Sequence, residues 1–533
     1  MSSREKSGTR WSQLSCHARR MGAAACVFAG AFGGSVASAD EAGDRDGGAY
    51  LLLALAEPGP TAAHGHEHKP PGMSPEAMPV PYSTEFFRPD PDYGNMPYDA
   101  AAQRDIYGAK RALITQRPWL ELGRDLYNYG PFQPTPNFFG EKNPTKPHLY
   151  VYGDWRTAVA YNDNGAVEKA LVATRLNLEV DVQLTSTERI HAFFRPLDKN
   201  GVFTRAEFGG DDPEESKFSI DGNVDALFFE GDLGAILNGI TGEYSTFDLP
   251  FAVGILPMLF QNGIWVEDAF TGLAVTIAAK NSAMFDISNY DITFFFGFDK
   301  VSTAAVPGTN SKVYLFGVTG FFEMWEGYLE VGYGFTLDDT GFGGSYHNIA
   351  AAFTKRYFGW LNNSVRVIAN VGQSPNGGAA QTATGVMFLI ENSIIVNEPA
   401  TIVPYFNFFL GVDKPQSLAR DAGAGGILKN TGILFETDGL TGFPTMDATG
   451  NDAFGVAVGI EFLFDLNMQL VFEIAAQHIY DDNATAPGDQ IGVGMRFQIP
   501  INNALIIRVD AMYALNEGGN NLSGIRTELR WKF

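Results

Sequence analysis

The sequence has little cysteine, little charge and no long hydrophobic run after its first 40 residues. Only 2 of 533 residues are cysteine, and 18% are charged, against about 25% in average soluble proteins. No stretch after residue 40 offers the roughly 20 strongly apolar residues of a membrane-spanning helix. Basic residues are also few, with 37 Lys and Arg against 61 Asp and Glu. We therefore expect no helical membrane span and no nucleic-acid partner.

Glycine and phenylalanine, by contrast, are abundant. The chain contains 60 glycines and 42 phenylalanines, and 45% of its residues are hydrophobic. This hydrophobic content is enough for a packed fold and argues against general disorder. Many glycines with many aromatic residues favour an all-β protein rich in tight turns.

The first 39 residues have the organisation of a secretory signal peptide. Basic residues precede an uncharged run of small residues over 21–36, and Ala37-Ser38-Ala39 fits the cleavage pattern. The alternative of a short membrane anchor is disfavoured because Gly and Ala dominate the run. Both cysteines, Cys16 and Cys26, lie in this segment, so the exported chain has neither disulfides nor thiolate metal sites. Export without an apolar helix leaves a soluble secreted protein or an outer-membrane β-barrel.

Residues 40–147 are rich in Pro, Gly and His and show little periodicity. We predict a mostly disordered extension that is partly helical over 103–128, with Pro118 interrupting the helical pattern. His64, His66 and His68 form a compact cluster of side chains that could bind Zn, Cu or Ni. Because a Pro-rich segment lacks the preorganisation of a closed site, we expect no metal centre and no cofactor.

From residue 148 to the end, segments of alternating apolar and polar residues recur between turn residues. The segments reach 10–15 residues, longer than the roughly 5–6 of soluble strands, whereas a spanning strand needs about 9–11. Charged residues keep to one parity, and a Lys or Arg facing lipid would cost about 2–4 kcal/mol. The pattern therefore favours a transmembrane antiparallel up-and-down β-barrel over 148–533 rather than a soluble sandwich. The predicted strands cover 148–161, 169–184, 189–197, 218–230, 249–256, 270–280, 290–298, 311–321, 325–336, 346–358, 364–372, 384–396, 401–411, 453–464, 467–479, 487–498, 502–513 and 523–533.

This count of 18 strands has 16 as its alternative, because 185–248 is the least regular part of the pattern. Asp198-Lys199-Asn200-Gly201 fits a hairpin turn. The same residues with Thr204 and Glu207 match part of a calcium-binding loop, but Pro196 occupies the first ligand position, so we favour the turn. Short and long connections alternate, as expected when turns face the periplasm and loops face outward. An even count then places 40–147 in the periplasm.

The chain ends in Arg530-Trp531-Lys532-Phe533. With the signal peptide and the alternation, this ending resembles that of Gram-negative outer-membrane porins. The resemblance implies that Phe533 is an assembly signal read by the barrel-assembly machinery, and that outer-membrane lipid surrounds the barrel. Segment 249–274 is similar to part of the alginate-export-type barrels, which also have 18 strands. That family usually has Arg-Gln where Ile255-Leu256 stands here, so the similarity implies the architecture and not the substrate.

Charged residues of inward parity are expected to line the pore. Closure of the barrel would bring the last strand beside the first two and gather several basic residues on one wall. Such a ladder can guide anions; alternatively, the charges pair across strands and only fill a polar interior. Loop 412–452 likewise has two interpretations, an inward fold that narrows the pore or a surface loop. The predicted pore-lining residues are Asp154, Arg156, Arg175, Glu179, Asp181, Arg366, Glu461, Glu473, Arg496, Arg508, Asp510, Arg526, Glu528, Arg530 and Lys532.

These observations predict a porin, a water-filled channel for passive diffusion of small solutes or ions, with a preference for anions. The alternative is a barrel that sheaths a periplasmic partner such as an electron-transfer protein, with 40–147 as its docking arm. A lipolytic enzyme using His478 is a third interpretation. The chain has no G-x-S-x-G, P-loop or H-E-x-x-H motif, so we expect no enzyme.

Overall fold

The computed structural model of the protein describes residues 95–97, 99, 117–123, 147–199, 201–210, 215–243, 246–306, 311–397, 401–431, 439–464, 468–481 and 488–533. The signal peptide, the histidine cluster and most of the predicted extension lie outside these residues. No helix among them is both long and apolar enough to cross a membrane.

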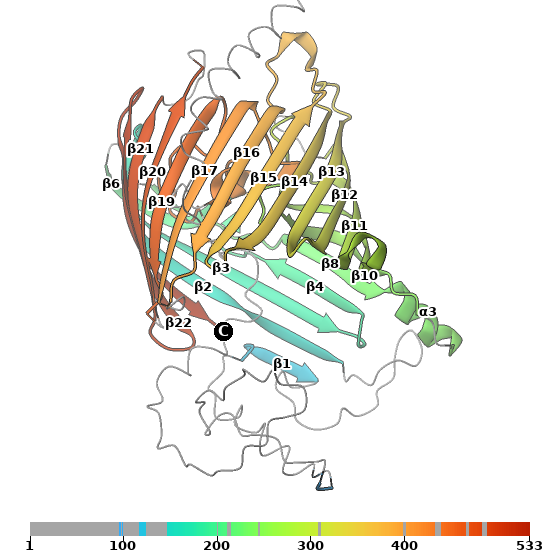
Figure 1. Ribbon diagram of the computed structural model, residues 1–533. Coiled ribbons are helices and arrows are strands. Elements are labelled where there is room, and N and C mark those ends of the chain that lie inside the picture. Colours follow the sequence, from blue (N-terminus) through green and yellow to red (C-terminus); the bar gives the residue numbers. More distant parts are fainter. Residues whose placement is uncertain are drawn as a thin grey trace, which may run out of the picture.

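The described residues form one antiparallel sheet that closes on itself as a barrel (Figure 1). The first barrel strand, β2 (His148–Asp163), pairs with β3 (Glu168–Gln183) on one edge and with the last strand, β23 (Leu522–Lys532), on the other. Eighteen strands form the ring, as the sequence predicted. The other long strands of the ring are β8 (Val224–Asp232), β9 (Pro250–Phe260), β10 (Val266–Ser282), β11 (Ile287–Asp299), β12 (Val313–Met324), β13 (Gly327–Asp338), β14 (Tyr346–Tyr357), β15 (Leu361–Val371), β16 (Thr384–Ile394), β17 (Ile402–Lys414), β19 (Ala453–Phe462), β20 (Gln469–Ile479), β21 (Gln490–Pro500) and β22 (Leu505–Asn516).

Alternation along each strand separates an apolar outer face from a polar inner face. On β23, Ile525 is 54% exposed on the outside, whereas Arg526 is 0% and Glu528 1% exposed within the barrel. Large exposed apolar side chains recur on β2, β8 to β16 and β19 to β23. A face of this kind is stable against lipid, and closure leaves no backbone edge unpaired in the hydrocarbon. The predicted parity of the strands is thereby confirmed.

The third strand of the ring is interrupted, which explains its weak sequence pattern. Both β4 (Arg189–Phe194) and β6 (Val202–Gly210) pair with β3, each along half of its length. Between them, β5 (Asp198–Lys199) turns back on β6, so the hairpin predicted at 198–201 is confirmed. Among the described residues no group of three or more His, Cys, Asp or Glu side chains is placed to hold a metal ion. A short β7 (Glu215–Lys217) pairs with β6, and β8 pairs with β4.

The two ends of the barrel differ in their connections. We call one end the turn rim: it carries the C-terminus and connections such as 325–326 and 358–360. The other end, the loop rim, carries 300–312, 372–383 and the longest connection, 415–452. The alternation of short and long connections is largely as predicted. The predicted long loop 257–269 is wrong, because β9 and β10 extend into it and leave only 261–265.

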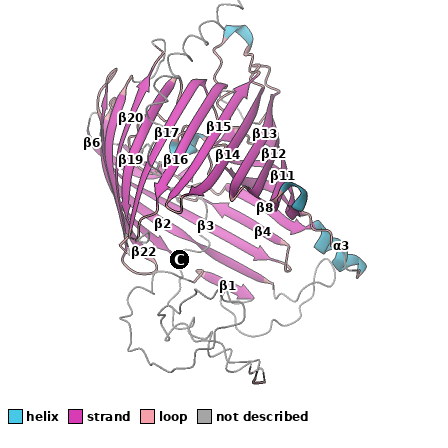
Figure 2. Cartoon of the chain, in the orientation of Figure 1, coloured by secondary structure: helices cyan, strands magenta, loops and turns pink. Residues whose placement is uncertain are grey.

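Helices are few and short (Figure 2). The one α-helix of the described residues, α3 (Leu233–Thr241), lies at the turn rim between β8 and β9 and was not predicted. Four 3-10 turns complete the described structure: η3 (Ala283–Phe285), η4 (Asn376–Gly378), η5 (Ala422–Ala424) and η6 (Lys429–Thr431).

The predicted extension contains one short strand among its described residues. Within the stretch expected to be partly helical, β1 (Leu120–Gly123) is a strand that pairs with β2 from Val151 to His148. β23 ends opposite Asp154, so the first residues of β2 would otherwise present an unpaired edge. β1 therefore continues the line of β23 below the C-terminus.

Candidate functional site in the barrel lumen

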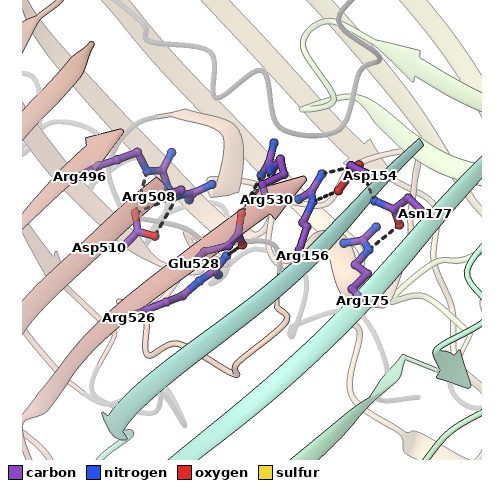
Figure 3. Close-up of polar contacts among 10 residues, drawn as sticks. All are labelled: Asp154, Arg156, Arg175, Asn177, Arg496, Arg508, Asp510, Arg526, Glu528 and Arg530. Carbon is purple, nitrogen blue, oxygen red and sulfur yellow. Dashed lines mark hydrogen bonds and ion pairs between the residues drawn. The ribbon is translucent and has the colours of Figure 1, made fainter. Parts of the chain in front are cut away.

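Six arginines gather on the inner face of five neighbouring strands, β21, β22, β23, β2 and β3. We call this surface the basic wall; its arginines are Arg496, Arg508, Arg526, Arg530, Arg156 and Arg175 (Figure 3). The pairing register places Arg156 directly opposite Arg530 on one side and Arg175 on the other. These three form an arginine row that crosses the seam where the barrel closes. The row exists because the parity of each strand is regular and because β2 joins β23.

Three carboxylates divide the basic wall. Asp510 lies 2.8 Å from Arg496 and 2.9 Å from Arg508. Glu528 pairs with Arg526 and lies 3.2 Å from Arg530. Charges therefore do pair across strands, as the alternative interpretation of a filled polar interior expected. The six arginines outnumber these three acids, and further carboxylates lie close by: Glu461 and Glu473 near Arg496, and Asp198 near Arg175.

Asp154 holds the arginine row at its β2 end. It lies 2.5 Å from Arg156 Nε and accepts a hydrogen bond of 3.0 Å from Asn177 Nδ2. Arg175 Nε donates to Asn177 Oδ1 at 2.8 Å. Asn177 therefore links the carboxylate to the third arginine and fixes its guanidinium. Asn177 is not among the predicted pore-lining residues, which are all charged, although it has inward parity on β3.

Acidic side chains dominate another stretch of the inner face, from β13 to β20. Arg366 and Glu391 form a buried pair at 3.0 Å, each 2% exposed. Glu473 accepts a hydrogen bond from Tyr405 at 2.5 Å. Glu461 accepts one of 2.6 Å from Gln469. Glu330 on β13, not predicted as a site residue, has the same inward parity as buried Gly332. These four carboxylates outnumber Arg366 on β15 and Arg356 on β14, the arginines of inward parity on those two strands, so the lumen is electrostatically asymmetric.

The remaining predicted residues lie near the turn rim. Asp181 is 3.9 Å from Arg189 and 3.8 Å from His191. Glu179 shares the inner face of β3 with it, and Lys532 lies in register with Asp154. Parity and closure together account for the positions of the basic residues on β21 to β23, β2 and β3. Ten predicted residues lie together on β21 to β23, β2 and β3: Asp154, Arg156, Arg175, Arg496, Arg508, Asp510, Arg526, Glu528, Arg530 and Lys532. Glu179 and Asp181 continue the same face of β3, Glu461 and Glu473 lie near Arg496, and Arg366 lies apart on β15.

The long connection between β17 and β19 folds into the lumen. We call its described residues, 415–431 and 439–452, the inner loop. Its short strand β18 (Ala419–Arg420) pairs with the first residues of β10. Tyr346 Oη donates to the carbonyl of Leu418 at 2.7 Å, and Asn162 Nδ2 donates to that of Thr441 at 2.8 Å. Leu418, Leu428 and Met446 are at most 1% exposed. Of the two sequence interpretations, the inward one is confirmed for these residues and the surface loop is wrong.

Arg420 is the main polar anchor of the inner loop. Its side chain is 8% exposed and pairs with Glu267 of β10 at 2.9 Å. Its other donors reach the carbonyls of Gly263, Ala424 and Gly425 at 2.5, 2.9 and 3.0 Å. One guanidinium therefore ties the loop both to itself and to the hairpin between β9 and β10.

Two glycines of β13 make room for this packing. A Cβ at Gly332 would lie 2.5 Å from the Trp265 ring, and one at Gly334 would lie 2.2 Å from the Leu418 side chain. Trp265 is fully buried and donates through Nε1 to Asn348 at 2.8 Å. The β9–β10 connection thus also turns inward and packs against the inner face of β13 and β14.

His478, the candidate for a lipolytic site, lies on the outer face of β20. Its Nδ1 is 2.7 Å from Asp489, and its ring packs edge-on against Phe454 at 5.2 Å. Among the described residues no serine hydroxyl contacts it. His478 therefore links the end of β20 to Asp489, the residue before β21, at the loop rim.

Comparisons with known proteins find similarity in structure and not in sequence. No family model and no curated protein matches the chain. Among solved structures, Pseudomonas aeruginosa OccK2 (OpdF) has a TM-score of 0.48 at 8% identity, over 72% of this chain and 97% of that one. P. aeruginosa OccK7 (OpdD) has a TM-score of 0.47 at 11% identity, over 72% and 98%. Wzi of Escherichia coli, an outer-membrane protein involved in group 1 capsule assembly and described as a carbohydrate-binding β-barrel, has a TM-score of 0.43 at 10% identity, over 72% and 84%.

Proposed function

We propose that the protein is an outer-membrane channel for passive diffusion of small hydrophilic solutes or ions, with a preference for anions. One observation carries the proposal: a closed barrel with an apolar outer face encloses a charged inner face that is partly covered by an inward-folded loop. A barrel that only needed to be stable in lipid could fill its interior with neutral side chains. Charges and a folded loop inside are the means by which a pore selects solutes.

The inner loop and the basic wall follow one another along the lumen. On β2, Ala158 and Ala160 lie in one buried cluster with Leu440 of the inner loop, and Arg156 is the next inward residue. On β23, a Cβ at Gly524 would lie 2.9 Å from the ring of Phe443, and Arg526 is the next inward residue. A solute entering at the loop rim therefore passes the inner loop and then meets the arginines.

We attribute the preference for anions to the six arginines gathered on the basic wall. Two unit charges about 6 Å apart in water interact by roughly 0.7 kcal/mol, which changes the local ion concentration about threefold. The arginine row places three such charges side by side, with the acidic stretch elsewhere on the inner face. Salt screens this field, so selectivity is expected to be strongest at low ionic strength.

Reversal potentials across planar bilayers test the preference. The test variants are Arg530→Gln and Arg175→Gln. Each is expected to lower the anion-to-cation permeability ratio about threefold. Glu528→Gln removes a carboxylate from the same wall and is expected to raise the ratio. Lys355→Gln is the matched control, because Lys355 pairs with Glu326 at the turn rim, outside the basic wall. An unchanged ratio in both arginine variants would overturn the proposed preference while leaving the channel itself intact.

The proposal includes the orientation of the barrel in the outer membrane. The turn rim carries short turns, the C-terminus and β1, so we place it and residues 40–147 in the periplasm. Protease added to intact cells is then expected to spare 40–147 and to cut it only after the outer membrane is opened. The sheath alternative gains no support, because the inner loop already occupies part of the space that an inserted partner would need.

A further inference from the structure

The helix α3 projects from the turn rim beside the barrel (Figure 1) and carries no charged residue. Leu233, Leu237 and Ile240 are 38%, 47% and 63% exposed. Their spacing of four and three residues puts them on one side of the helix. We call this side the apolar face of α3. Exposure of aliphatic side chains to water is unfavourable in proportion to their area. We therefore expect this face to be covered by a partner.

The direction in which the apolar face points is fixed. The Asp232 carboxylate accepts hydrogen bonds from Ala235 N at 2.6 Å and from Leu249 N at 2.8 Å, which joins the start of the helix to the start of β9. Gly234 is buried on the other side of the helix, where a Cβ would lie 1.6 Å from the carbonyl oxygen of Phe247. The helix is therefore held against the chain by its small-residue side, and its apolar face is turned away from the barrel.

The apolar face continues a larger apolar surface. Phe247, in the same connection, is 47% exposed. Met284 and Phe285, in the turn between β10 and β11, are 86% and 62% exposed. β9 pairs with β10, so these residues belong to neighbouring connections of one rim. This surface joins the lipid-facing side of β8 and β9, where Leu227 and Val253 are each 43% exposed.

We propose that α3 is a membrane-interface helix, whose apolar face lies at the boundary between headgroups and acyl chains of the leaflet at the turn rim. Lipid is favoured over a protein partner by two observations: continuity with the lipid-facing side of the barrel, and the absence of any charge on the helix that could choose a partner. Helices of this kind bury one face a few ångströms into the boundary region. Here the polar side that such helices usually turn to water is replaced by contacts with the protein's own backbone. The inference requires a barrel that spans a membrane and is independent of its ion selectivity.

Single-cysteine labelling tests this position, because residues 40–533 contain no cysteine. Leu237→Cys and Ile240→Cys, each labelled with an environment-sensitive fluorophore, are refolded in phospholipid vesicles. Ile474→Cys on the outer face of β20 and Glu517→Cys in a loop-rim connection are the lipid-exposed and water-exposed references. We expect brominated phospholipid to quench the labels at 237 and 240, as it quenches the label at 474, and aqueous iodide not to reach them as it reaches 517. Quenching by aqueous iodide as at 517 would overturn the proposal.

A further outcome separates lipid from protein. Protection of both labels from both quenchers would mean that the face packs on protein, and would also overturn the proposal. Leu237→Asn with Ile240→Asn is expected to abolish lipid quenching at a label on Phe247→Cys and to leave single-channel conductance unchanged. Because the conductance reports the channel and the quenching reports the helix, the two proposals fail separately.

Discussion

Replacing Arg420 by methionine is expected to release the inner loop from the lumen. The guanidinium makes an ion pair with Glu267 and reaches three backbone carbonyls, with the arginine side chain 8% and the glutamate side chain 16% exposed. Removing one partner of a buried pair costs about 3–5 kcal/mol, largely because the other charge stays buried and unpaired. About 3 kcal/mol raises the population of the released loop roughly a hundredfold. Methionine keeps most of the packing of the arginine stem, so the loss is mainly electrostatic.

Two assays can detect the release of the inner loop. Single-channel recordings of Arg420→Met are expected to show larger or more variable conductance, because the loop no longer narrows the lumen. Chymotrypsin added to vesicles is expected to cleave after Leu428 and Leu440, which are at most 1% exposed when the loop is in place. Glu267→Gln in the same chain removes the unpaired charge and is expected to restore part of the original behaviour. Lys429→Met is the matched control, because Lys429 donates only an exposed hydrogen bond of 3.0 Å to Gly423. Unchanged conductance and unchanged protection in Arg420→Met would refute this account of the anchor.

Three further changes test separate parts of the structure. Gly332→Leu forces a side chain into the space of the Trp265 ring, so we expect a change of conductance like that of Arg420→Met; normal conductance would show that the β9–β10 connection does not pack there. Arg366→Met is expected to lower the free energy of unfolding by about 3–5 kcal/mol in urea titrations, and Arg366→Met with Glu391→Met by much less, since no charge is then left unpaired. Trp119→Ala removes an edge-on contact of 6.3 Å with Phe533 and is expected to slow barrel closure in refolding assays, with Trp325→Ala as the control for loss of a turn-rim tryptophan. Equal rates in the two variants would mean that β1 does not support the seam.

The sequence predicted the barrel well because the rule behind it is local. Every strand must turn apolar residues to lipid at every second position, so strand number, parity and the basic wall could be worked out from spacing and closure. The arginine row followed because Arg156, Arg175 and Arg530 share inward parity on strands that closure makes neighbours.

Features set by contacts between distant residues were not predictable in the same way. The inward fold of 415–452 depends on donors such as Asn162 and Tyr346 on strands far away in the sequence, so two interpretations remained open. The strand β1 was not predicted, because nothing in the sequence shows that β2 extends beyond the end of β23 and leaves an edge for β1 to pair with. The third strand was ambiguous because its residues are divided between β4 and β6. Asn177 and Glu330 have inward parity and were not predicted as pore-lining residues; Asn177 acts through hydrogen bonds, which a pattern of charges does not reveal.

The most direct test of the account is the reversal potential of the refolded chain 40–533 in a planar bilayer with a salt gradient at low ionic strength. The account predicts discrete open channels whose reversal potential has the sign of anion permeation. The anion-to-cation permeability ratio is expected to fall towards one as salt is raised. Open channels that favour cations would contradict the role given to the basic wall. A barrel that never conducts would contradict the proposed channel itself.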